Sequence, residues 1–389
     1  MKANNIIPAN RVSSVKEYYF SRKLKEVARL NSEGRDIISL GVGGPDRPPH
    51  DSVIQTLCDE VVKSDVHSYQ SYVGLPALRK AYSEWYKNWY GVSLNPDNEI
   101  LPLIGSKEGI LHISMAFLNE GDGVLVPNPG YPTYTSVSKL LGAEIYSYNL
   151  KEELGWYPDF EELEKLPLEK VKLMWVNFPN MPTGAKASKE LFEKIIAFGK
   201  KHNILIVNDN PYSFILNDNP ISLLSVEGAK DIAIELNSLS KSHNMAGWRM
   251  GMLASNPQFV EWILKVKSNI DSGQFKPMMM AAIHALSCEN EWYSELNKVY
   301  KERRKVAEKI MNELNCEFDA TQQGLFLWGK IPADAESSEK FADNILYNAS
   351  VFITPGFIFG SNGERFIRIS LCATAEKMEE ALLRIKNMK

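Results

Sequence analysis

Short apolar runs alternate along the chain with longer stretches in which apolar residues recur every three or four positions. The short runs are typical of buried strands and the longer stretches of amphipathic helices. The helical pattern is found at residues 76–90, 107–118, 135–141 and 189–202. The strand pattern is found at residues 100–104, 123–127, 144–148, 172–176, 204–207 and 232–236. Because the two patterns alternate, we expect an α/β domain with a mostly parallel central sheet flanked by helices.

The pattern changes after Gly251. Helices are then predicted at residues 259–269, 291–314, 337–349 and 375–388, with short strands between some of them. Near the N-terminus a helix is predicted at residues 18–31, followed by an apolar run at 37–40. We therefore predict three segments. The N-terminal arm and helix (1–45) and the C-terminal part (281–389) form a smaller α+β domain. The middle of the chain (46–280) forms a large domain.

Composition narrows the class of protein. Of the 389 residues, 44% are hydrophobic and 24% are charged, which is ordinary for a globular protein. The net charge of −4 gives no electrostatic basis for binding nucleic acid or an anionic membrane. The N-terminus lacks the apolar core of a signal peptide, and the longest uncharged apolar stretch, 277–288, is too short to span a bilayer. The four cysteines show no CxxC spacing and the six histidines no HxxxH spacing, so we expect a cytoplasmic protein without a metal site.

Lys241 lies in the most informative segment, residues 238–251, which reads SLSKSHNMAGWRMG and follows a predicted strand. A lysine in a small polar loop at a strand end can be desolvated, which lowers its pKa and frees its amine for Schiff-base chemistry. Ser238 and Arg249 supply a hydroxyl and a guanidinium that suit a phosphate dianion. Taken alone, an SxSK sequence is more often a surface lysine in a serine-rich turn.

Two further segments place polar groups at strand ends. Asp209 and Tyr212 follow the strand predicted at 204–207, where a buried carboxylate needs a cationic partner. The alternative is an aspartate that caps the next turn. The GSKEG sequence at 105–109 opens a helix, and its free N–H groups and helix dipole favour a phosphate. Ser106 also fits a simple helix N-cap, and both interpretations can hold together.

Taken in order, these segments resemble the class I/II aminotransferases of pyridoxal-phosphate fold type I, from residue 40 to the C-terminus. The sequence is most similar to the aspartate and LL-diaminopimelate aminotransferase-like branches. The resemblance implies a pyridoxal 5'-phosphate cofactor held as an aldimine by Lys241, which then moves a proton between the substrate Cα and the cofactor. It also implies that Asp209 pairs with the pyridine nitrogen and that Tyr212 hydrogen-bonds the phenolic oxygen.

The resemblance assigns more residues to the cofactor. Tyr131 would stack on the pyridine ring. Tyr69, with Tyr72 as the competing candidate, would reach the cofactor phosphate of the second subunit in a homodimer. The full cofactor-binding set that it implies is Tyr69, Ser106, Lys107, Tyr131, Asn180, Asp209, Tyr212, Ser238, Ser240, Lys241 and Arg249.

Two residues are assigned in the same way to the substrate carboxylate. Arg368 would grip it with a bidentate pair, which a lysine could not mimic. Arg365, three residues earlier, is more typical of a surface charge. Gly43 would offer a backbone N–H to the same carboxylate. The glycine-rich turn around it is not a dinucleotide-binding fingerprint, because it lacks the third glycine at the required place.

One position departs from the family pattern. The family reads Asn-Pro-Thr-Gly where this chain has Met181 before Pro-Thr-Gly, and that asparagine hydrogen-bonds the phenolic oxygen of the cofactor. Methionine has no hydrogen to donate. Either Asn180 reaches the oxygen instead, or Tyr212 holds it alone. In the second case we expect a raised pKa for the imine proton of the bound cofactor.

The expected activity is the transfer of an amino group from an L-amino acid to a 2-oxo acid, by a homodimer with shared active sites. Two alternatives stay open on the residues: a carbon–sulfur β-lyase with the same cofactor, and a regulatory protein that keeps the pocket without catalysis. The substrate side chain is undetermined. Its candidate contacts are the cations Arg47 and Lys107 and the aromatic residues Tyr18, Tyr19 and Phe20.

Overall fold

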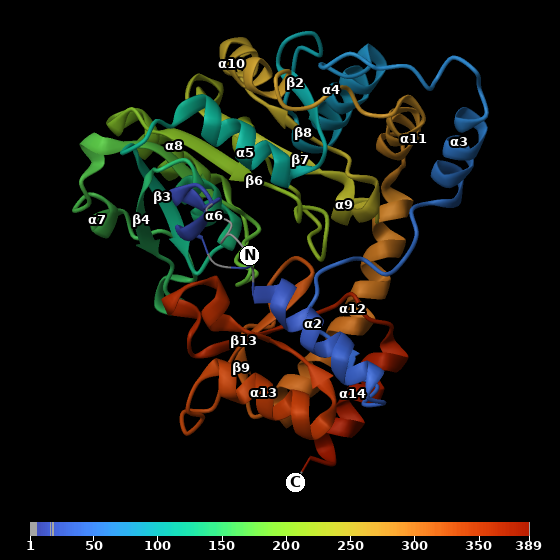
Figure 1. Cartoon of the computed structure of the whole chain (residues 1–389), viewed down its shortest axis with the longest axis vertical. Helices are drawn as coiled ribbons and strands as arrows, with labels where there is room; N and C mark the ends of the chain where they lie inside the picture. The colour runs from blue at the N-terminus through green and yellow to red at the C-terminus, as the bar shows by residue number, and fades with distance from the viewer. Residues whose placement is uncertain (1–5, 16, 18, 389) are drawn as a thin grey trace.

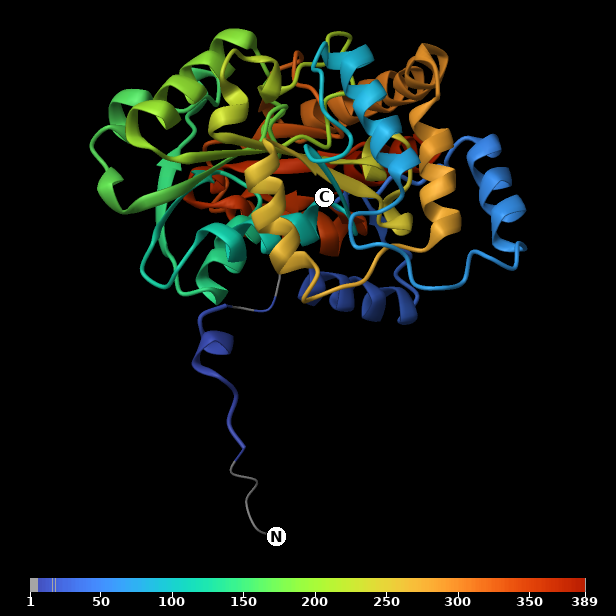
Figure 2. The same ribbon diagram turned by 90° about the horizontal axis from the view of Figure 1, so that it is seen from above.

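The computed structural model describes residues 6–15, 17 and 19–388. A large part built on a seven-stranded sheet lies above a smaller part in Figure 1. Tyr18, the first residue of the predicted N-terminal helix, lies outside the described residues, and helix α2 spans Tyr19–Ser32. Before it, the described residues carry only the short helix α1 (Asn10–Ser13), which contacts the helix at 132–140, and the residues ahead of α1 extend away from the body of the molecule (Figure 2).

The large sheet has the strand order β2-β8-β7-β6-β5-β3-β4. Its strands are β2 (Ile100–Leu103), β3 (Gly123–Asn128), β4 (Glu144–Asn149), β5 (Val171–Val176), β6 (Leu205–Asp209), β7 (Ala233–Ser238) and β8 (Gly251–Ala254). Strand β8 runs antiparallel to β2 and β7, and the other four pairs are parallel. The predicted mostly parallel sheet is therefore confirmed.

Helices cover both faces of this sheet, because side chains of a strand point alternately to the two faces and here both sides are apolar. In β5, Leu173 and Trp175 pack with the helices of one face, while Met174 and Val176 pack with those of the other. The first face is covered by α5 (Ser106–Phe117), α6 (Pro132–Leu140) and α10 (Pro257–Lys267). The second is covered by α4 (Pro76–Tyr90), α8 (Lys189–His202) and α11 (Lys276–Leu286), with α3 (Asp51–Val61) packed outside α11.

The smaller part combines both ends of the chain. Strand β1 (Ile38–Ser39) pairs in parallel with β11 (Val351–Phe352), and Leu40 shares a buried core with Leu325 and Ile367. A four-stranded antiparallel sheet is ordered β12 (Thr354–Pro355), β13 (Phe366–Ser370), β10 (Phe326–Lys330) and β9 (Glu317–Phe318). Its helices are α12 (Asn290–Glu313), α13 (Ser338–Ala349) and α14 (Ala375–Lys386). The residue limits of the predicted domains stay a prediction.

Two further properties of the described residues bear on the expected setting. All four cysteines are free thiols. None of the helices in the described ranges is both long enough and apolar enough to cross a bilayer.

Candidate active site

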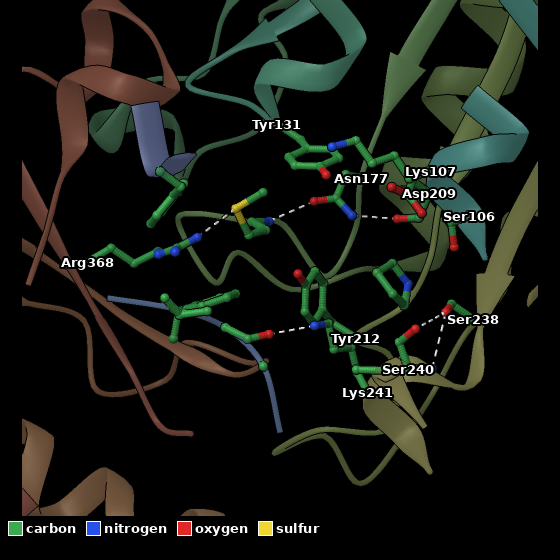
Figure 3. A pocket seen from close by; sticks show the side chains of 18 of the residues that line it. Ser106, Lys107, Tyr131, Asn177, Asp209, Tyr212, Ser238, Ser240, Lys241 and Arg368 are labelled. Atoms are coloured by element: carbon green, nitrogen blue, oxygen red, sulfur yellow. Dashed lines mark hydrogen bonds between the residues drawn. The ribbon is translucent and has the colours of Figure 1, made fainter. Parts of the chain in front are cut away.

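A cavity of about 410 Å³ lies between the large sheet and the smaller part. One wall is formed where parallel strands end: Asp209 closes β6, Ser238 closes β7, and Tyr131 and Asn177 follow β3 and β5. Parallel strands present their carboxyl ends at one edge of the sheet, so residues far apart in sequence meet there. The facing wall comes from α2, the turn at 42–44, β10 and β13 (Figure 3).

Lys241 lies in the short helix α9 (Leu239–Ser242), directly after β7. Its side chain lines the cavity, and its Nζ donates a hydrogen bond of 2.5 Å to the carbonyl oxygen of Gly43. Desolvation at the cavity wall lowers the pKa of Lys241 below its usual value. A neutral amine is nucleophilic and can accept a proton, so the structure gives Lys241 the properties that Schiff-base chemistry needs.

The cavity has a polar end where α5 begins. Ser238 Oγ donates to Ser240 Oγ over 2.8 Å, and Ser106 Oγ is buried without a hydrogen-bond partner among the described residues. A Cβ on Gly105 would lie 2.2 Å from Nη2 of Arg249, so only glycine leaves the guanidinium its place. Hydroxyl groups, a guanidinium and a helix N-terminus together fit a phosphate dianion.

Asp209 offers an unsatisfied carboxylate oxygen to the cavity. The hydroxyl of Tyr134 donates to its Oδ2 over 3.0 Å, whereas Oδ1 has no partner among the described residues. Burial raises the pKa of Asp209 to about 6, although the Tyr134 hydrogen bond opposes the rise. A buried carboxylate of this kind is stabilised by a cationic N–H, and a protonated pyridine nitrogen fits that need.

Two tyrosines line the cavity between these groups (Figure 3). Desolvation raises the pKa of both Tyr131 and Tyr212, so both keep their hydroxyl protons and act as donors. The Tyr131 ring packs edge-on against Tyr134 at 5.5 Å, which holds its orientation. A flat aromatic ligand therefore meets a ring at Tyr131 and a hydroxyl donor at Tyr212.

Arg368 enters the cavity from β13 and is buried, with 4% of its surface exposed. Its Nη2 donates to the carbonyl oxygen of Gly41 over 2.9 Å, and its Nη1 lies 3.1 Å from the sulfur of Met181. Arg365 instead binds the backbone carbonyls of Pro332 and Ala335, outside the cavity. Arg368 therefore lines the cavity, whereas Arg365 is half-buried elsewhere and is not the surface charge that was expected; the carboxylate role of Arg368 stays a prediction.

Asn180 does not line the cavity, although it was predicted to bind the cofactor. Its amide nitrogen donates to the carbonyl of Asn177 over 3.1 Å, and its amide oxygen accepts from the Thr183 hydroxyl over 2.8 Å. Both ends of the amide therefore hold the local turn, and the hydroxyl of Tyr212 is the remaining donor of the two that were considered. Met181 does line the cavity.

The other predicted residues differ in whether they line the cavity. Tyr69 lies outside the cavity, with 92% of its surface exposed. Arg47 does not line the cavity either, whereas Lys107 does. The structure brings together Gly43, Ser106, Lys107, Tyr131, Asp209, Tyr212, Ser238, Ser240, Lys241, Arg249 and Arg368.

Sequence reasoning missed Tyr134 and Asn177. The Asn177 amide donates to the backbone oxygen of Asp209 and accepts from the N–H of Met181 over 2.8 Å, so it joins two walls of the cavity. A signal existed for each residue. Tyr134 lies three residues after Tyr131, which on a helix brings both to one side, and Asn177 directly follows a strand.

A charged cluster lies beside the polar end. His112 Nε2 lies 2.6 Å from Glu108 Oε1 and 3.1 Å from Asp271 Oδ2, a spacing that three metal ligands could have. Asp271 also binds the ammonium of Lys267, which supplies the positive charge. The cluster therefore connects α5 to residues 267–271.

Comparison with known proteins gives a consistent result. The sequence profile of the family described as aminotransferase class I and II matches residues 35–385. An LL-diaminopimelate aminotransferase from Dehalococcoides mccartyi is 39% identical over 383 residues, which are 98% of each chain. The substrate-bound BacF structure from Bacillus subtilis is 36% identical, with a TM-score of 0.94 and 98% of each chain covered. An aromatic aminotransferase structure from Pyrococcus horikoshii is 30% identical, with a TM-score of 0.86 and 94% of this chain and 98% of the other covered.

Proposed function

This chain belongs to the class I and II aminotransferases, and we propose that it transfers amino groups at the cavity built around Lys241. The cofactor of the family is pyridoxal 5'-phosphate, which when bound stabilises negative charge that develops at the substrate Cα. The observation that carries the proposal is the desolvated Lys241 amine, which lines one cavity with the unsatisfied carboxylate of Asp209 and the guanidinium of Arg368.

The residues at the polar end hold the cofactor phosphate. The backbone N–H groups of Ser106 and Lys107 open helix α5, and the hydroxyls of Ser238 and Ser240 face the guanidinium of Arg249. If the cofactor were bound with its phosphate there, the carboxylate of Asp209 would be the group that keeps its pyridine nitrogen protonated. Tyr131 would supply a ring for its face, and Tyr212 a hydroxyl donor for its ring oxygen.

Lys241 moves the proton of the reaction. In its neutral form, Nζ can accept the proton of the substrate Cα, hold it, and return it on the same side of the cavity. The hydrogen bond to the Gly43 carbonyl holds the amine on the side of the cavity where the substrate lies. Arg368 binds the substrate carboxylate and so presents the Cα–H bond to the amine.

The single chain leaves the phosphate end open. Lys107 and Arg249 are exposed although they line the cavity. The segment that carries Tyr69 packs closely on Gly273, where a Cβ would lie 2.4 Å from the Ser71 carbonyl oxygen, yet Tyr69 itself is exposed. Ile6, on the N-terminal arm, is 85% exposed. A homodimer in which Tyr69 of each subunit closes the phosphate end of the other accounts for these exposed groups.

Absorbance of the purified protein tests the proposal. The visible band of the bound cofactor is expected to convert on addition of an L-amino acid and to return on addition of a 2-oxo acid. Release of pyruvate and ammonia from cystathionine without an oxo acid would instead support the β-lyase. A band that no amino acid converts would support the regulatory protein. Light scattering during gel filtration measures the mass, and a monomeric holoenzyme would overturn the shared site.

The names of the similar proteins leave the substrate open. One relative is named for LL-diaminopimelate, and one solved structure is an aromatic aminotransferase. Membership of the family therefore sets the reaction without setting the side chain of the amino donor.

A further inference from the structure

The cavity has two chemically different halves. The half built on the large sheet carries the polar groups described above. The half built on the smaller part and the N-terminal helix is apolar, and its lining residues are Phe20, Leu24, Val42, Phe326 and Phe359. Leu24 and Val42 have 38% and 40% of their surface exposed, which is unfavourable unless something covers them.

Three aromatic rings surround the guanidinium of Arg368. Its central carbon lies 3.8 Å from the ring centre of Phe326, 4.7 Å from that of Phe359 and 5.7 Å from that of Phe20. An amino acid that binds Arg368 through its carboxylate has its side chain only two bonds away. These rings are therefore within reach of that side chain.

The other basic side chains of the cavity lining lie away from the rings around Arg368. Of the described residues that line the cavity, Lys107, Lys241 and Arg249 are the remaining basic side chains. Figure 3 shows Lys107 beside Asp209, across the cavity from Arg368. Arg249 approaches Ser240 and Gly105 at the polar end. A second carboxylate on the substrate would be desolvated beside aromatic rings, without a second cation among the described lining residues of that half to pair with it.

From these contacts we propose that the amino donor carries a large apolar side chain, aromatic or branched aliphatic, which binds between helix α2 and the Phe326–Phe359 wall. The proposal rests on the proposed function, because it concerns the substrate of the same site. The 2-oxo acid formed from this amino donor carries the same side chain, and it occupies the same subsite when the reaction runs in reverse.

The first test compares four amino donors with the holoenzyme. L-phenylalanine, L-leucine, L-aspartate and LL-diaminopimelate are added separately, and conversion of the cofactor absorbance is followed. L-phenylalanine or L-leucine is expected to react with kcat/KM at least about tenfold above that of the two charged donors. A faster reaction with aspartate or LL-diaminopimelate would overturn the proposal and would place the missing cation on the partner subunit. No conversion by any donor would overturn the proposed function itself.

The second test measures binding without reaction. 3-Phenylpropanoate and glutarate both present a carboxylate but lack the amine, so calorimetry with the holoenzyme reports affinity alone. 3-Phenylpropanoate is expected to bind at least about tenfold more tightly. Equal affinity, or tighter binding of glutarate, would contradict an apolar subsite even if the enzyme is active.

A pair of variants locates the subsite. Leu24→Lys places a cation at the mouth of the apolar half, whereas Ser32→Lys adds the same charge at the exposed far end of the same helix. Leu24→Lys is expected to shift the ratio of kcat/KM for L-phenylalanine to that for L-aspartate by about fivefold toward aspartate. The Ser32→Lys ratio is expected to stay at that of the parent. Equal ratios in the two variants would contradict the assignment of α2.

Discussion

The two halves of the cavity are assembled in different ways. In the sheet half, the chemical groups directly follow strand ends, so that Asp209, Ser238 and Lys241 are placed by β6 and β7. In the apolar half, Phe20 and Phe326 come from α2 and β10, more than 300 residues apart in the chain, and meet only because both ends build the smaller part. The difference separates chemistry from recognition: the sheet edge fixes the reacting groups, while the wall that contacts the side chain can change without disturbing them.

Removal of the Lys241 amine tests the sheet half with the largest expected effect. Lys241→Ala lacks the amine that we propose both links the cofactor and moves the proton, so transamination is expected to fall by at least about 10³-fold. Rates at saturating substrate and circular dichroism measure activity and folding. Lys265→Ala, which removes an exposed lysine of α10, is the matched control and is expected to keep its activity. Activity of the Lys241 variant above a tenth of the parent's would contradict the role.

The unsatisfied carboxylate of Asp209 predicts a pH-dependent stability difference. Burial raises the pKa of Asp209 from 3.8 to about 6, so the unfolded chain ionises first, and the folded apoprotein loses stability as the pH rises between these values. The full loss is on the order of 3 kcal/mol. Apoprotein with Asp209→Asn is therefore expected to be more stable than the parent at pH 8, by a margin that shrinks below pH 6.

Urea unfolding at pH 5 and pH 8 measures this margin. The holoenzyme supplies the control, because the protonated ring nitrogen pairs with the carboxylate there and the variant is expected to bind the cofactor more weakly. A constant margin across this pH range would show that Asp209 does not titrate as its burial predicts.

Two arginines test the apolar half: Arg368 lies in β13, and Arg365 lies directly before that strand. Arg368→Lys loses the bidentate geometry inside an aromatic cage, and kcat/KM for the amino donor is expected to fall by about 100-fold. Arg365→Lys is the same substitution at a residue whose partners are the backbone carbonyls of Pro332 and Ala335, outside the cavity. Its kcat/KM is therefore expected to stay within about twofold of the parent's. Steady-state kinetics with the same donor compare the two, and similar losses would remove the carboxylate role from Arg368.

Met181 lies between the two halves of the cavity, and its substitution has the smallest expected effect of these changes. Both ends of the Asn180 amide are engaged, so of the two candidate donors to the ring oxygen we expect Tyr212 to act. Met181→Asn adds a donor there, so the pH midpoint of the visible absorbance of the bound cofactor is expected to fall by about half a unit to one unit. Met181→Leu, which adds no donor, is the control. Spectrophotometric titration measures both, and equal midpoints would exclude Asn-type donation from this position.

The sequence predicted some elements and motifs more accurately than others. The helix at 76–90 and that at 189–202 have the predicted limits, because strong apolar periodicity ends at clear stop signals. Helix α11 was not predicted, since a continuous apolar run has no period that distinguishes a buried helix from a strand. Asn180 shows the limit of motif reasoning: its position in the motif suggested a cofactor contact, but the turn uses both ends of its amide.

The sequence by itself determined the parallel sheet, the lysine segment and most of the polar residues, because each depends on a local pattern of apolar spacing or on groups that directly follow a strand. Only the tertiary structure decided which side chains surround Arg368, which hydrogen bonds leave an Asp209 oxygen unsatisfied, and which residues of the cavity lining stay exposed. Those features depend on packing between segments that are distant along the chain. The physical reason is that desolvation and aromatic contact are properties of the neighbours in space, and a sequence read along its length does not show them.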